Sequence, residues 1–411
     1  MFKKYILLAS FLISGVSFSQ NNTSSPYSIF GLGIENKTSS AGLNGLGNTG
    51  IAVTNPLQIN FYNPASLGNV KRKSFLYEFG VNGVFSTIQT DGDTNQTNDV
   101  NLSHIALAFP VSNNFGIGAG LLPYTKVGYS INVDQEVQGT SETFTTFTTG
   151  SGGLNEFYLS SGVKLGKVVS VGLQLSYLFG SVDELTQLFN DVLFTFTNEN
   201  HYTGMKLSGG FQYSFPNNKT HIGGTFDFNT FLNGTQNRTA FITTNNGVSQ
   251  TIENTSDNEL DQIELPLSFG IGISTEVYKD FTANFDLRKA FWENTKQTVN
   301  EEVYTNQTTY AFGLEYDPSV NNLKYWNKLK YRLGFNYDTG FIKISDQQID
   351  SYFVSAGLGI PINKTGMNNL NISYSYGTEG TVTRSLIQEN FHKLTLNLNF
   401  VGNWFKERKI F

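Results

Sequence analysis

Apolar and polar residues alternate along most of this chain, and the alternation limits what the chain can fold into. Residues 393–400 read KLTLNLNF and residues 281–288 read FTANFDLR; similar alternation recurs at 171–177, 205–215, 310–316 and 331–337. Successive side chains of a β-strand point to opposite faces, so each segment would place its apolar residues on one face. The sequence therefore predicts an all-β protein.

Soluble β-sandwiches also alternate, but further features favour a transmembrane barrel. The alternating segments run to about ten residues or more, matching the roughly 9–11 residues of a tilted membrane-spanning strand. Their apolar faces often end in Tyr or Phe, as the aromatic girdles of outer-membrane barrels do. Charged residues make up only 15% of the chain, against roughly 25% in soluble domains. We therefore expect a transmembrane antiparallel β-barrel.

The connections between these segments predict the number of strands. Six turns on one side and seven polar loops on the other join about fourteen strands, and an even count with short turns and longer outer loops is typical of outer-membrane barrels. We place the barrel at residues 73–400 and a C-terminal tail at 401–411. The expected turns lie at 112–114, 166–167, 216–218, 277–280, 317–328 and 363–369, and the expected loops near 89–99, 132–152, 183–200, 233–261, 291–306, 343–349 and 380–389.

The N-terminus has the features of a secretory signal peptide. Lys3 and Lys4 precede an apolar run from Tyr5 to Val16, and small residues follow at a cleavage site before Gln20. The run is shorter than the roughly 20 residues of a spanning helix. We expect residues 1–19 to be removed after export and the mature protein to lie in the outer membrane of a Gram-negative cell.

Composition excludes several kinds of chemistry. The chain has no Cys and only four His, and none of the histidines has the spacing of a metal-ligand pair. The formal charge of −6 argues against a nucleic-acid partner, which would call for a basic patch. We expect no metal, no cofactor and no enzyme activity, although an outer-membrane enzyme built from distant strands stays a third alternative.

Charged residues on the polar faces of the strands would point into the lumen of the barrel. A charge that faced lipid at the midplane would cost about 2–4 kcal/mol, so we expect these side chains to pair with each other or with a plug. Gly116, Gly118 and Gly120 would face the lumen too, and their missing side chains would allow close approach of other backbone. The charged set comprises Glu78, Lys206, Asp227, Asp286, Arg288, Glu315 and Arg332.

Residues 20–72 precede the first wall strand and include QINFYNPASLGNV at 58–70. That stretch has too little alternation for a wall strand and too many apolar residues for an exposed linker. The lumen of a fourteen-stranded barrel is wider than its own side chains fill. We therefore expect residues 20–72 to form a plug, or hatch, with Asn63-Pro64 as a fixed turn.

One expected outer loop carries an unusual apolar pattern. Within Val182–Asn200 the residues Leu185, Leu188, Phe189, Val192 and Leu193 follow the spacing of an amphipathic helix. We expect a helix of two to three turns there, and its apolar face would be a docking surface for a ligand or a protein, or would pack on a neighbouring loop.

An N-terminal segment that ends in Asn-Pro-Ala, followed by fourteen strands, resembles the FadL family of transporters of long-chain fatty acids and hydrocarbons. SPYSIFGLGI, NPASL and KLTLNLNFVGNWFKERK also resemble FadL-like barrels of Bacteroidota. The resemblance implies a hatch in the barrel and a kink in the third strand that opens the wall to the membrane. By our count Pro123 lies in that strand, either at such a gap or just beyond the lipid zone.

Two functions follow from the resemblance. The first is passive uptake of long-chain fatty acids or other hydrophobic small molecules through the hatch-gated lumen and the lateral opening. The second is a non-transporting accessory or scaffold subunit of a larger outer-membrane complex, a role that FadL-like barrels of Bacteroidota play in type IX secretion. Partners would thus be membrane lipid and either a hydrophobic ligand or other outer-membrane proteins. The candidate ligand-binding residues are Phe30, Leu32, Phe61, Asn63, Pro64, Leu121 and Pro123.

Overall fold

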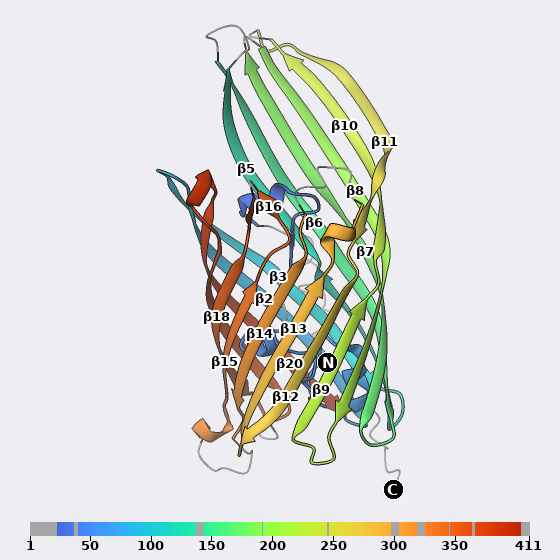
Figure 1. Cartoon of the computed structure of the whole chain (residues 1–411). Helices are drawn as coiled ribbons and strands as arrows, with labels where there is room; N and C mark the ends of the chain where they lie inside the picture. The colour runs from blue at the N-terminus through green and yellow to red at the C-terminus, as the bar shows by residue number, and fades with distance from the viewer. Residues whose placement is uncertain are drawn as a thin grey trace, which may run out of the picture.

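The computed structural model of this chain describes residues 23–36, 40–136, 143–190, 192–244, 246–296, 304–318, 325–344, 346–363 and 366–403. They form a closed antiparallel barrel of fourteen wall strands (Figure 1). The first wall strand pairs with the last from Ser74↔Asn403 to Gln89↔Gln388, which closes the wall. The fold class predicted from the alternation is confirmed. The expected signal peptide lies outside the described residues.

Three of the wall strands are interrupted and each consists of two successive elements: β4 and β5, β9 and β10, and β11 and β12. The wall elements are β2 (Ser74–Gln89), β3 (Thr94–Pro110), β4 (Phe115–Pro123), β5 (Thr125–Glu136), β6 (Thr143–Leu165), β7 (Val169–Asn190), β8 (Val192–Ser214), β9 (Thr220–Asp227), β10 (Thr230–Thr243), β11 (Ser249–Leu265), β12 (Ser268–Tyr278), β13 (Phe281–Ala290), β14 (Gln307–Tyr316), β15 (Lys330–Asp338), β18 (Ser351–Pro361), β19 (Asn369–Gly380) and β20 (Gln388–Asn403).

The remaining elements are short. Strand β1 (Ile34–Glu35), helix α2 (Ala41–Asn44) and the 3-10 helices η1 (Pro26–Ile29) and η2 (Pro64–Asn69) belong to the N-terminal segment. Strands β16 (Lys343–Ile344) and β17 (Gln347–Gln348) and the 3-10 helices η3 (Trp292–Asn294), η5 (Tyr325–Lys328) and η6 (Thr383–Ser385) lie between wall strands. None of the helices described is long and apolar enough to cross a membrane.

The alternation separates the two faces of the wall as expected. On β7, Leu173, Leu175 and Tyr177 are exposed on the outer face, whereas Ser176 is buried. Gly116 and Gly118 on β4 face the lumen, where they lie against Leu67 of the N-terminal segment. The last strand runs to Asn403, so the expected barrel end at Phe400 is three residues too early; residues 404–411 lie outside the described chain.

On one side of the barrel the strands continue far beyond the rest of the wall (Figure 1). We call this extension the hood; it comprises residues 127–136, 143–152, 182–190, 192–200, 236–243 and 249–258 of β5, β6, β7, β8, β10 and β11. Strands β6 and β8 each have 23 residues, about twice the length that spans a membrane. The hood curves over the outer mouth.

Three of the expected loops are instead strands of the hood. Residues 132–152, 183–200 and 233–261 are largely β-hairpins, because Thr, Phe and Asn alternate there and pair in register with the neighbouring strand. The helix expected within Val182–Asn200 is also wrong: Leu185 pairs with Thr197, and Leu188 with Phe194. Since successive strand residues alternate, Leu185, Phe189 and Leu193 lie on one face of the hood, and Leu188 and Val192 on the other.

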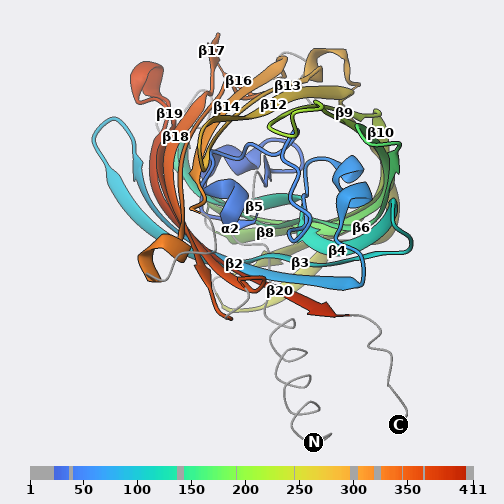
Figure 2. The ribbon, with the colours of Figure 1, turned by 90° about the horizontal axis from the view of Figure 1, so that it is seen from below.

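The N-terminal segment lies inside the barrel (Figure 2). Most of residues 40–52 are buried, and so are residues 63–68 of the turn and helix η2. Ala41, Leu43, Ile51 and Ala65 are each at most 2% exposed. We use the name hatch for the described residues 23–36 and 40–72.

Candidate functional site

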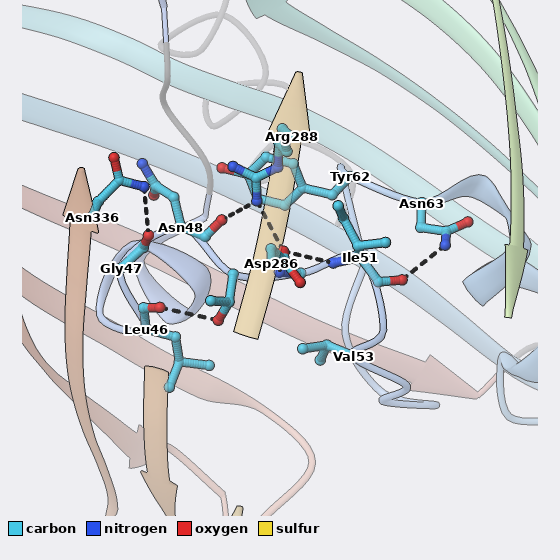
Figure 3. Close-up of polar contacts among 12 residues, drawn as sticks. Leu46, Gly47, Asn48, Ile51, Val53, Tyr62, Asn63, Asp286, Arg288 and Asn336 are labelled. Carbon is cyan, nitrogen blue, oxygen red and sulfur yellow. Dashed lines mark hydrogen bonds and ion pairs between the residues drawn. The ribbon is translucent and has the colours of Figure 1, made fainter. Parts of the chain in front are cut away.

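Hydrogen bonds fix the centre of the hatch to the wall (Figure 3). The Asp286 carboxylate on β13 accepts the backbone N–H groups of Gly50 at 2.7 Å and Ile51 at 3.1 Å. Arg288, two residues further along the same strand, pairs with Asp286 at 2.9 Å and donates to the carbonyl of Asn48. Hydrogen bonds to a charged partner are the stronger kind, about 1.5–3 kcal/mol each. The hatch is therefore firmly attached to the wall.

Wall glycines let the hatch backbone approach closely. A Cβ at Gly334 on β15 would overlap the backbone of Gly47, and one at Gly313 on β14 would meet Leu46. Gly47 itself has φ +67°, a left-handed conformation that favours glycine. The Asn336 side chain donates to the Gly47 carbonyl at 3.0 Å. Backbone therefore packs directly on backbone along this side of the lumen, and no passage separates them there.

The Asn-Pro-Ala sequence has an explicit structural role. The side-chain Oδ1 of Asn63 caps η2 by accepting the N–H of Ala65 at 3.1 Å. Its side-chain Nδ2 donates to the carbonyl of Ile51 at 2.8 Å and to that of Phe211, on β8, at 3.0 Å. Asn63 is fully buried, so one side chain joins the turn, the central hatch and the wall.

A cavity of about 240 Å³ remains between the hatch and the wall. Three of the predicted binding residues, Phe61, Pro64 and Pro123, line it. Most of its other side chains are polar or charged, which differs from the mainly apolar lining of sites for hydrophobic ligands. The polar lining includes Glu35, Asn36, Asn48, Glu156, Gln174, Lys206, Asp227, Arg288, Lys289, Gln307, Thr309, Asn336 and Asp338.

The charges around this cavity pair with each other, as the sequence predicted for the lumen. Lys206 Nζ lies 3.3 Å from Asp227 Oδ1, and Ser268 donates to Asp227 Oδ2 at 2.8 Å. The Arg288 guanidinium lies 4.2 Å from the ring centroid of Tyr62 in the hatch. Paired charges of this kind hold a structure in place and are costly to strip of their partners or of water.

The third wall strand is kinked at Tyr124, next to Pro123. Strand β4 pairs with β3 as far as Leu121↔Ile105, and β5 beyond the kink pairs with β6 on one side. Its other side pairs with β1 of the hatch through Ile34↔Lys126. On β6, Gly152 and Gly153 have φ of +112° and +135°, so glycine permits the bend opposite the kink. The strand therefore leaves β3 and turns towards the hatch.

Aromatic side chains close the outer end of the lumen. The rings of Trp292, Tyr304 and Phe341 stack at centroid distances of 4.6–6.0 Å. Phe30 and Leu32 of the hatch lie beside these rings, around a cavity of only about 30 Å³. Burial raises the pKa of the Tyr27 hydroxyl to about 12, so it stays neutral and donates to the Ile387 carbonyl at 2.5 Å.

The predicted binding residues therefore fall into separate places. Phe61, Pro64 and Pro123 meet at the polar cavity, whereas Phe30 and Leu32 lie at the outer mouth. Asn63 lies in neither cavity lining and instead forms hydrogen bonds within the hatch and to the wall. Leu121 lies on the opposite face of β4 from Gly118 and Gly120, which face the lumen.

Sequence reasoning missed the polar residues that hold the hatch. Gln212 donates to Ile51 and Val53, Asn399 to Leu57, and Ser373 and Ser375 to Asn44. These residues share one feature in the sequence: each is a polar residue on the inner face of a strand. Many other residues of the wall have the same feature, so it does not single them out. Among the described residues, no cluster of His, Asp and Glu could hold a metal ion.

Wall, hatch and kinked third strand together give this chain the fold of FadL-type barrels. The toluene transporter TodX of Pseudomonas putida matches with a TM-score of 0.62 at 15% identity, covering 90% of this chain and 99% of TodX. The toluene transporter TbuX of Ralstonia pickettii gives 0.59 at 14% identity, with 88% and 98% covered. A FadL homologue from Pseudomonas aeruginosa gives 0.59 at 12% identity, with 90% and 99% covered. Two of these neighbours, TodX and TbuX, are toluene transporters.

The chain itself belongs to the BamG family, whose model matches residues 1–411. No curated protein matches the chain in sequence.

Proposed function

We propose that this protein is a non-transporting accessory subunit of a larger outer-membrane protein complex, of the kind that assembles or secretes other proteins. The observation that carries the proposal is the filling of the lumen. Hatch backbone lies against wall backbone at Gly47 and Gly334, and Asp286 and Arg288 hold the hatch through charged hydrogen bonds. The cavity beside Phe61 and Pro123 is lined mainly by polar and charged residues.

A hydrophobic ligand would gain little from such a lumen. Sites for hydrophobic molecules are typically apolar and about 300–1,000 Å³ in volume. The cavity beside Phe61 and Pro123 has about 240 Å³ and is lined by ion pairs such as Lys206 with Asp227. The apolar space beside Phe30 and Leu32 has about 30 Å³. Passage of a fatty acid would require both the ion pairs and the aromatic stack to rearrange.

The hood supports a role in protein contact. Its concave face continues the lumen side of β7 through Val182, and it carries a cross-strand row of Val133, Leu188, Phe194 and Ile242. Val133 is 43% exposed in this row. The family name BamG also has the prefix used for subunits of the barrel-assembly machinery, which suggests the kind of complex.

Native mass spectrometry of the protein tests the proposal after affinity purification from its own outer membrane in a mild detergent. We expect other outer-membrane proteins in fixed stoichiometry and no bound hydrophobic ligand. Tagged protein added after solubilisation serves as the control for association in the extract. A monomer that carries a long-chain lipid or a hydrocarbon would contradict the proposal.

A second candidate is passive uptake of long-chain fatty acids or other hydrophobic small molecules. The observation that favours it is the kink after Pro123, which separates β5 from β3, together with the fold shared with toluene transporters. Uptake of radiolabelled palmitate and toluene into proteoliposomes tests it. Rates above those of empty vesicles that fall in a Pro123→Ala variant would support transport; rates equal to those of empty vesicles would exclude it.

A further inference from the structure

The kink in the third strand leaves two strand edges that face one another. Among the residues described, Thr94–Val100 of β3 pair only with β2, and Gly128–Asp134 of β5 pair only with β6. Strand edges present unpaired N–H and C=O groups that are ready to bind another strand. A closed barrel whose strands pair along their full length has no such edges.

A cavity of about 690 Å³ lies between these edges. Its lining comes from both sides of the gap: Asn95 and Thr97 on β3, and Gly128, Ser130 and Asn132 on β5. The hydroxyl of Thr97 is buried and makes no hydrogen bond to the described chain. The gap is therefore a space bounded by backbone edges.

The hatch already uses the inner end of this gap. Strand β1 pairs with β5 at Lys126 and Thr125. The N–H of Gly128 donates to Ser28 Oγ at 2.9 Å, and Ser24 donates to Asp99 on β3 at 3.2 Å. The hatch, with Ser24 and with Ser28 of helix η1, thus lies between the two strands at this level. Because backbone groups alternate along a strand, the N–H groups of Ser130, Asn132 and Asp134 point into the gap as that of Gly128 does.

The two edges of the hood differ in their protection against pairing. The edge strand β11 pairs with β10 through three register shifts and carries the acidic residues Glu253, Asp257, Glu259 and Asp261. Bulges and charges are the usual means of blocking an exposed edge. The β5 edge pairs with β6 without a register shift from Val127 to Glu136, and Tyr129, Ile131 and Val133 alternate along it. The fold therefore blocks one edge and leaves the other regular.

We propose that the gap between β3 and β5 binds one extended strand of a partner protein, which pairs with the β5 edge above the hatch. The proposal rests on the subunit role proposed above and names how a partner would be held. Apolar and polar residues would alternate along the partner strand. Its apolar side chains would lie on the same face of the sheet as Tyr129, Ile131 and Val133, and its polar side chains on the same face as Ser130 and Asn132. Pairing along Ser130–Asp134 would span about 13 Å at roughly 3.3 Å per residue.

Amide hydrogen exchange tests the proposal on two samples: the complex purified from the native membrane, and the barrel alone in lipid nanodiscs. We expect the amides of Ser130, Asn132 and Asp134, whose N–H groups point into the gap, to exchange at least about tenfold more slowly in the complex, because a new ladder protects them. Amides at 249–260 on the blocked β11 edge serve as the internal comparison and should change little.

A pair of variants adds a second readout. Ser130→Pro removes an N–H that points into the gap and keeps the ladder to β6, as Pro is tolerated at a strand edge. Ser130→Ala keeps the N–H and is the matched control. We expect Ser130→Pro to weaken retention of the partner about five- to tenfold, the order expected for a lost hydrogen bond, and Ser130→Ala to retain it. Heat-modifiable migration in gels checks that both barrels fold.

The outcomes separate the two proposals. A stable complex in which 128–134 exchange as fast as in the barrel alone would overturn strand binding and leave the subunit role standing. Slow exchange in the nanodisc barrel without partner would mean that lipid or the chain itself covers the edge, and would also overturn it. Failure to find any complex would overturn the subunit role, and strand binding with it.

Discussion

The carboxylate of Asp286 on β13 accepts the backbone N–H of Gly50 in the hatch at a distance of 2.7 Å. The two residues are 236 positions apart in the chain, so the contact forms only when the hatch is seated in the wall. Asp286 is 1% exposed and Arg288 is its ion-pair partner.

Asp286→Asn should therefore destabilise the seated hatch. The variant removes the charge that two hatch N–H groups and Arg288 share, and a cost of about 1–3 kcal/mol is expected for lost charged hydrogen bonds. The shift of the urea midpoint in lipid vesicles measures it. Asp317→Asn is the control, because the ion pair of Asp317 with Lys330 is partly exposed and should contribute less than about 1 kcal/mol. Equal shifts in both variants would argue against a fixed hatch.

Gly334→Ala should displace the hatch without altering the outer surface. Its Cβ would overlap the backbone of Gly47, which cannot move away from the wall without breaking its bond to Asn336. Limited proteolysis at residues 40–70 should become faster by an order of magnitude or more. Gly209→Ala is the control, since the nearest atom to its Cβ would be a Leu173 side-chain carbon at 3.9 Å. Unchanged proteolysis in Gly334→Ala would contradict close backbone packing.

Trp292→Ala should open the outer mouth. The ring stacks on Phe341 at 4.6 Å, and loss of a large aromatic side chain from a packed cluster costs about 3–5 kcal/mol. We expect ion conductance in planar bilayers to rise from a low wild-type level. Trp326→Ala serves as the control because Trp326 is 70% exposed at η5. If both variants conduct like the wild type, another part of the chain seals the lumen.

The two faces of the hood should differ in partner binding. Leu188 lies on the concave face beside Phe194, and Leu185 on the opposite face beside Thr197. Leu188→Asp should reduce co-purification of the partner at least several-fold, because a charge would replace part of an apolar contact, whereas Leu185→Asp should reduce it little. The reverse order would place the partner on the convex face.

The hood should be more stable in mild acid than at neutral pH. Burial, with a smaller contribution from nearby Glu199, raises the pKa of Asp183 above its ordinary value. The folded hood thus favours the protonated carboxyl, and its stability falls as pH rises through that raised pKa. Hydrogen exchange of the β7–β8 hairpin between pH 4 and pH 7, corrected for intrinsic rates, measures this. Asp183→Asn should flatten the dependence, and an unchanged slope would assign it to another group.

The sequence determined the wall. Alternation at segments such as 393–400 places apolar side chains on lipid and polar ones in the lumen, and membrane thickness sets the strand length, so about fourteen antiparallel strands could be predicted. Asn63-Pro64 could be predicted as a turn, because both residue types favour one locally. Local preference and the solvent on each side suffice for features of this kind.

The hood and the predicted helix show where local pattern is insufficient. Leu185, Leu188 and Phe189 have helical spacing, yet they lie in a strand. Their segment pairs with β6 and β8, where many of the paired residues are Thr and Phe, which favour strands. These hydrogen bonds outweigh the weak helical preference of the segment. The pairing that decides this comes from the neighbouring strands β6 and β8, and the spacing of apolar residues within 182–200 does not reveal it.

The filling of the lumen was decided by tertiary structure alone. Gly47 meets Gly334, and Asp286 meets Gly50, only after the wall has closed around the hatch. The sequence predicted that Asp286, Arg288 and Lys206 face inward, but it contained no information on which charges would pair or how much space would remain. Alternation fixes the face of each side chain through the strand period, whereas the distances across the lumen depend on how fourteen strands and the hatch pack together.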